Sequence, residues 1–175
     1  LHPLCKGSVD IRRYAFDETH GLHVCRLAAS LFDQLRDQHA LGAAERRVLL
    51  AAALLHDIGS FVSFKKHHKH SSYLIANAEL PGLSEREILL AATVARYHRR
   101  AEPQPDHEPY QQLSRAEQKA VRRLAGVLRL ADALDRDHRQ RVQRVVAARR
   151  GKDVVLQLDG AGDLLLERWS LQRRV

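Results

Sequence analysis

The sequence predicts a mainly α protein, in which a helical bundle is followed by a small antiparallel β-sheet. Three observations favour this fold class. Apolar residues recur every three or four positions through most of the first 138 residues, the period of a helix buried on one side. Two capping boxes, Ser84 with Glu87 and Ser114 with Glu117, are typical helix starts within that stretch. Beyond it, short apolar runs between glycines are typical of strands.

Five helices are predicted, separated by polar or turn-forming segments. They span residues 17–38, 43–58, 70–79, 84–100 and 114–135. Asp17 is a suitable N-cap for the first helix. The second is apolar on nearly all sides, so we expect it at the centre of the bundle, with Gly59 as its C-cap. Residues 60–69 are expected to form a basic loop, and 101–112, with three of the five prolines, a surface loop.

Three short strands are predicted near the end of the chain. They span residues 142–148, 153–159 and 163–171. Gly160-Ala161-Gly162 is expected to form a hairpin turn between the last two. The predicted organisation is therefore a helical domain over residues 1–138 and a small antiparallel β extension over 139–175.

The charge balance favours an anionic partner. Lys and Arg number 29 against 21 Asp and Glu, which makes a net charge of +8 and a pI near 10.0. Aromatic residues make up only 5%, too few for extensive base stacking on single-stranded nucleic acid. A nucleic-acid partner would rest on the pI alone, so we do not expect one.

The sequence also bears on location. No apolar run approaches the roughly 20 residues that cross a bilayer, so no membrane partner is expected. Two cysteines cannot form a disulfide framework, and without a secretion signal we expect a cytoplasmic protein. Met is absent even at position 1, so we expect a segment of a longer protein.

Several polar residues lie on apolar helix stripes. His20, His56, Asp57, His98 and Asp132 each continue or end a run of Val, Ala, Leu or Ile. One such histidine is commonly only a hydrogen-bonded core residue, and a buried carboxylate is costly unless it is paired or binds metal. Several on separate helices together predict a metal site. Imidazole and carboxylate without cysteine suit Mn, Fe, Co, Ni or Zn.

The order of these residues resembles the HD-domain metal-dependent phosphohydrolases. The string HGLHV begins at His20, LHDIG contains the doublet His56-Asp57, and LADAL contains Asp132. Further strings, HHKHS at residues 67–71, ELPGLS and ARYHRR, resemble the C-terminal HD region of the exopolyphosphatase / guanosine pentaphosphate phosphatase (Ppx/GppA) family. This resemblance covers roughly residues 14–138.

The resemblance implies a metal-binding HD helical bundle. The implied ligands are His20, His56, Asp57, His70, His98 and Asp132. Asp57 is the implied catalytic residue and bridge between ions, and the cofactor is one or two divalent ions (Mn, Fe, Co, Ni, Zn or Mg). The neighbouring His67 and His68 are expected in the loop, and His138 on the surface.

Basic residues near these ligands are candidates for phosphate binding. Lys69, Arg99 and Arg100 follow or precede implied ligands, so they would lie near the metals if the ligands converge. The alternative for all three is solvated surface charge.

Two functions remain open. The first is a metal-dependent phosphohydrolase acting on a phosphoester or phosphoanhydride, either a nucleotide or polyphosphate. The second is a non-catalytic module that binds polyphosphate and forms a homodimer. The second is implied because the family's established phosphatase chemistry belongs to N-terminal actin-like domains, which these residues do not contain.

Overall fold

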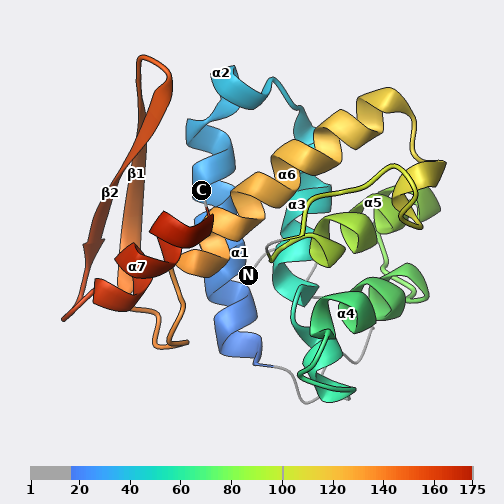
Figure 1. Ribbon diagram of the computed structural model, residues 1–175, viewed down its shortest axis with the longest axis horizontal. Helices are drawn as coiled ribbons and strands as arrows, with labels where there is room; N and C mark the ends of the chain where they lie inside the picture. Colours follow the sequence, from blue (N-terminus) through green and yellow to red (C-terminus); the bar gives the residue numbers. More distant parts are fainter. Residues whose placement is uncertain (1–16, 100, 175) are drawn as a thin grey trace.

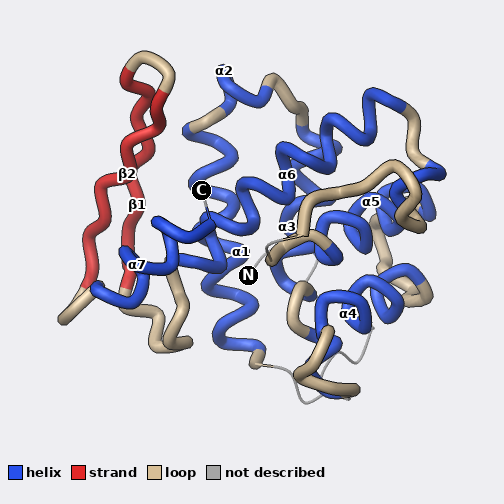
Figure 2. Tube along the Cα trace, in the orientation of Figure 1, coloured by secondary structure: helices blue, strands red, loops and turns tan. Residues whose placement is uncertain are grey.

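The computed structural model describes residues 17–99 and 101–174, and it confirms a mainly α fold. Figure 1 shows the helices packed as a bundle beside one β-hairpin, and Figure 2 separates helix from strand. The helical part comprises α1 (Glu18–Gln34), α2 (Arg36–His39), α3 (Ala43–Leu55), η3 (Ile58–Phe61), α4 (His67–Ala76), α5 (Glu85–Arg96), η4 (Tyr110–Gln112) and α6 (Arg115–Ala133). None of the helices within the described ranges is long and apolar enough to cross a membrane.

The core forms around α3, as predicted. Every residue from Val48 to Leu55 is buried, and α1, α5 and α6 all pack against this helix. In Figure 1, α6 runs diagonally across α1 and α3, while α4 and α5 lie together on the side away from the hairpin. An apolar helix surrounded in this way forms the centre of the buried core.

The predicted helix starts are confirmed by their hydrogen bonds. The Asp17 side chain accepts from the His20 backbone N–H at 2.9 Å. Ser84 with Glu87 and Ser114 with Glu117 both form complete capping boxes. These caps satisfy backbone donors that would otherwise have no partner in the first turn.

The region after α3 differs from the prediction. The α-helix ends at Leu55, and Gly59 lies inside η3 rather than capping α3. Gly59 is required there by close packing, because a Cβ would lie 2.3 Å from Ser71 N and 2.4 Å from His67 O. The basic loop is also shorter than predicted, since Lys66 adopts a left-handed conformation (φ 64°) and α4 begins at His67.

The C-terminal region is a two-stranded hairpin followed by a helix. β1 (Val142–Arg150) pairs antiparallel with β2 (Asp153–Gly160) through a turn at Gly151. The hairpin turn predicted at 160–162 is wrong, because β2 is followed by a helix and not by a third strand. The third predicted strand is wrong, because all but its first two residues lie in α7 (Leu165–Arg174). The buried side chains of Glu167 and Ser170 are three residues apart, which is helical spacing and not strand alternation.

The hairpin is attached to the bundle through α1. The side-chain amide of Gln34 donates to Val145 O at 3.0 Å and accepts from Ala147 N at 2.8 Å. Val142 and Val145 are buried in the same apolar cluster as the helices. The hairpin therefore shares the core of the bundle, and α7 places the partly buried Leu171 against it. Whether residues 139–175 act as a separate unit stays a prediction.

Candidate metal centre

Six ligand-type side chains from separate elements meet at one end of the bundle. They are His20 on α1, His56 and Asp57 after α3, His67 at the start of α4, His98 after α5, and Asp132 on α6. All except Asp57 are buried, and Asp57 is partly accessible. The elements carrying them are far apart in sequence, so the fold alone assembles the group.

The first part of the centre joins three buried side chains. His20 Nε2 and His56 Nε2 each lie 3.7 Å from Asp132 Oδ1. The two rings are 5.2 Å apart between centroids. One carboxylate oxygen and two imidazole nitrogens thus face a common point, a donor set that divalent transition metals favour.

The second part is built around Asp57 and is more compact. Asp57 Oδ1 lies 3.1 Å from His67 Nε2 and 3.4 Å from His98 Nε2. These two nitrogens are 3.3 Å from each other. His56 Nε2 is 3.7 Å from the same Asp57 oxygen, so this carboxylate lies between the two parts of the centre.

The tautomer of each ligand histidine is set by a partner on its other nitrogen. Each Nδ1–H donates to an oxygen: His20 to Asp135 Oδ2 (2.8 Å), His56 to Ala53 O (2.8 Å), His67 to Phe64 O (3.0 Å) and His98 to Ala95 O (2.7 Å). With Nδ1 as the donor, a neutral ring presents a lone pair at Nε2. Such support from outside the ligand shell is typical of metal-binding histidine.

The ligand atoms fit a cation better than they fit one another. Within the described ranges, His20 Nε2, His56 Nε2 and Asp57 Oδ1 are buried and lack a hydrogen-bond partner. In the neutral tautomers, Asp57, His67 and His98 bring three acceptors within 3.4 Å of one another with no proton between them. A cation at this point would relieve that repulsion and pair the orphaned atoms, so the residues fit a metal.

The buried histidines of the centre differ in pKa. Burial lowers the pKa of His98 to about 3, assisted by the nearby His56, so its ring is neutral. Burial also opposes charge on His56, but Asp57 and Asp132 outweigh it and raise its pKa to about 9, so in the metal-free chain its Nε2 carries a proton that a bound ion would displace. Asp57 is likewise desolvated, yet the neighbouring charge of His56 holds its pKa far below the ordinary value. The carboxylate is therefore ionised and available as a ligand.

A cavity of about 510 Å³ opens onto the centre. It is lined by Asp17, Asp57, Ser60, Phe61, Phe64, His67, Arg99, Arg136 and His138. The predicted phosphate-binding residue Arg99 is thus at the cavity, and Arg136 joins it. Lys69 is exposed and does not line the cavity, and Arg100 lies outside the described residues.

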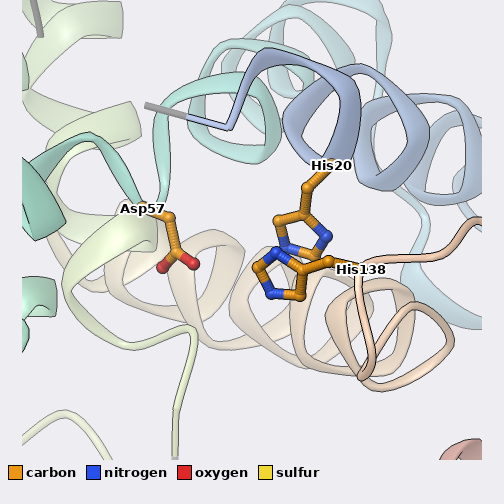
Figure 3. A group of neighbouring side chains, drawn as sticks. All are labelled: His20, Asp57 and His138. Atoms are coloured by element: carbon orange, nitrogen blue, oxygen red, sulfur yellow. The ribbon is translucent and has the colours of Figure 1, made fainter. Parts of the chain in front are cut away.

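Figure 3 shows a further histidine beside the centre. The rings of His138 and His20 stack with centroids 3.6 Å apart and planes 6° apart. His138 Nδ1 donates to Asp17 Oδ2 at 2.9 Å. His20, Asp57 and His138 each offer a ligand atom within 4.8 Å of the others, so His138 borders the candidate centre.

Three residues that line the site, His67, Arg136 and His138, were not predicted there from the sequence. His67, expected in a loop, begins α4 and lies 3.1 Å from Asp57 Oδ1. The ligand groups found among the described residues include neither His67 nor His70, so the ligand role expected of His70 stays a prediction. His67 lies in a helix and not in the predicted loop because α4 starts three residues earlier than predicted, with His67 Nδ1 bonded to Phe64 O. His138 is a surface residue as predicted, but it and Arg136 lie at the site. In the sequence, the adjacent histidines His67 and His68 were the signal that could have placed His67 at the site.

One comparison with known proteins bears on this centre. Residues 10–173 match the family described as Ppx/GppA phosphatase, domain III. The chain belongs to this family. The match extends through α6, the hairpin and most of α7, so the C-terminal region is part of the Ppx/GppA domain and not an unrelated addition. The family resemblance in the sequence is confirmed.

Proposed function

We propose that this Ppx/GppA domain is a metal-dependent phosphohydrolase of the HD type. The observation that carries the proposal is that three buried atoms, His20 Nε2, His56 Nε2 and Asp57 Oδ1, converge without hydrogen-bond partners in the described structure. His20, His56, Asp57 and Asp132 would hold one ion. Asp57, His67 and His98 would hold a second, with Asp57 shared between them. Mn, Fe, Co, Ni, Zn or Mg is the proposed cofactor.

The chain's own residues would bind and orient the substrate. When bound, a divalent ion supplies Lewis-acid activation of water and neutralises charge on a phosphoryl group. Arg99 and Arg136 would bind the non-reacting phosphate oxygens as guanidinium partners. Asp57 would mark the end of the cavity at which the phosphate reacts, because it is partly accessible and lines that space.

The proposed substrate is a phosphoester or phosphoanhydride, either a nucleotide or polyphosphate. The net charge of +8 and the two cavity arginines support an anionic substrate. The family name supports phosphatase chemistry of this class.

The test is phosphate release after loading with each divalent ion in turn. Nucleoside phosphates and polyphosphate are offered to the wild type, Asp57→Asn and Asp33→Asn. Asp33 forms an exposed ion pair with Arg46 and serves as a charge-matched control. We expect metal-dependent release that Asp57→Asn abolishes and Asp33→Asn leaves intact. Absence of release with every ion and substrate would refute the catalytic proposal.

The second candidate is a non-catalytic polyphosphate-binding and dimerisation module. The basic charge balance favours it equally, because an electropositive surface needs no metal. It predicts salt-dependent polyphosphate binding without hydrolysis, unchanged by Asp57→Asn, and a dimer by light scattering.

A further inference from the structure

Phe64 places an exposed aromatic ring at the mouth of the candidate site. Its side chain is 76% exposed, yet it lines the same cavity as Asp57 and His67. A single exposed ring on an open surface needs no explanation. This ring is different because it faces a cavity that also holds charged groups and metal-ligand atoms.

The backbone of Phe64 is anchored to the centre. Its carbonyl accepts the Nδ1–H of His67 at 3.0 Å, and its ring centroid is 5.6 Å from that of the imidazole. The next turn of chain is also constrained, since Lys66 takes a left-handed conformation and leads directly into α4. The backbone of Phe64 is therefore fixed next to His67, and its exposed ring lies beside that imidazole.

The cavity combines two chemistries. Arg99 and Arg136 offer guanidinium groups to phosphate oxygens, whereas Phe64 offers apolar ring surface. Inorganic polyphosphate has no part that gains from an aromatic ring. A ligand with phosphate at one end and a flat heterocycle at the other would use both.

We propose that the site accepts phosphate compounds that carry a nucleobase, and that Phe64 determines this specificity by stacking against the base. The proposal rests on the proposed function and narrows its substrate class from any phosphorylated anion to nucleotides. Phe64 is a binding residue in this account and leaves the metal ligands unchanged.

The test compares two ligands that differ only in the base, AMP and ribose 5-phosphate. Binding to the EDTA-treated chain is measured by titration calorimetry, so the readout does not depend on hydrolysis. We expect AMP to bind about tenfold more tightly, which is within the range of base–aromatic stacking. Phe64→Ala should remove the difference by weakening AMP alone, and Phe64→Trp should preserve it.

Tyr73→Ala is the matched control variant. Tyr73 is an exposed aromatic residue on α4 that does not line the cavity, so its removal should leave the AMP preference unchanged. Equal binding of AMP and ribose 5-phosphate to the wild type would overturn the proposal. So would an AMP preference that survives Phe64→Ala.

The outcomes separate this proposal from the proposed function. Hydrolysis of both ligands with equal kcat/KM, together with equal binding, would leave the phosphohydrolase standing and remove the base specificity. A base preference without hydrolysis would support the base specificity and refute the phosphohydrolase. Because Lys65 and Lys66 follow Phe64, binding to vesicles of phosphatidylcholine and phosphatidylglycerol is also measured. Vesicle binding lost in Phe64→Ala, with no AMP preference, would overturn the proposal in favour of a lipid surface.

Discussion

Asp135 supports the centre without being one of its ligands. It is fully buried, and its Oδ2 accepts from His20 Nδ1 at 2.8 Å and from the Gln140 side chain at 3.3 Å. Its Oδ1 accepts from the Gln140 backbone N–H at 2.7 Å. Although burial raises the pKa of Asp135, these donors outweigh it and hold the pKa below the ordinary value. Asp135 is thus an ionised acceptor on both oxygens.

Asp135→Asn keeps the shape and removes one acceptor. If the amide oxygen faces His20, the NH₂ group faces the Gln140 N–H, and two donors meet in a buried space. If the amide is reversed, His20 must present Nδ1 as an acceptor and carry its proton on Nε2, which removes the lone pair from the centre. Either orientation costs about 1–3 kcal/mol of unfolding free energy. Metal affinity should fall about 10- to 100-fold, typical for loss of such a partner.

Two measurements check this reasoning. Metal affinity is obtained by competition with a chelator of known affinity, and stability by urea unfolding of the metal-free chain. Asp33→Asn removes an exposed carboxylate far from the centre and should change neither metal affinity nor, beyond about 1 kcal/mol, stability. An Asp135→Asn variant with wild-type metal affinity would refute the role assigned to the Asp135–His20 contact.

Two glycines and one capping ion pair give further predictions, all read by urea unfolding. Gly59→Ala should destabilise by about 1–3 kcal/mol or more, because its Cβ would lie 2.3 Å from Ser71 N. Gly126→Ala, which meets nothing within 4 Å inside α6, should instead stabilise by up to about 1 kcal/mol; equal effects would contradict the packing argument. The hydrogen bond from Arg86 lowers the pKa of Glu117 from 4.5 to about 2, so its contribution is complete above pH 4.5 and disappears as the pH falls through 2. Glu117→Gln should therefore destabilise at pH 7, by about 1 kcal/mol or less, and progressively less below pH 4.5; a pH-independent difference would contradict this.

Structural features that depend on local hydrogen bonds, such as helix starts, can be predicted from the sequence. Asp17, Ser84 and Ser114 start helices because their side chains satisfy donors within three residues, and no distant contact is needed. The same holds for the apolar core of α3, whose composition leaves few other places for it in a fold of this size. The polar residues on apolar helix stripes could also be identified from the sequence as site candidates, because such positions face the core.

Other features depend on distant contacts and could not be predicted in this way. The start of α4 at His67 depends on Lys66 in a left-handed conformation and on the packing of Gly59 against α4. His138 reaches the centre through a turn in which its own φ is positive (57°). The segment that forms α7 is short and rich in leucine, and apolar runs of that length do not distinguish helix from strand.

Metal content of the purified chain tests the central claim most directly. Mass spectrometry is applied to the wild type, His56→Ala, His67→Ala and His70→Ala, each before and after incubation with Mn, Co or Ni. The structure predicts near-stoichiometric metal in the wild type and in His70→Ala, with loss in His56→Ala and reduced content in His67→Ala. A wild type that holds no metal under any of these conditions, or metal lost in His70→Ala and kept in His67→Ala, would contradict the account.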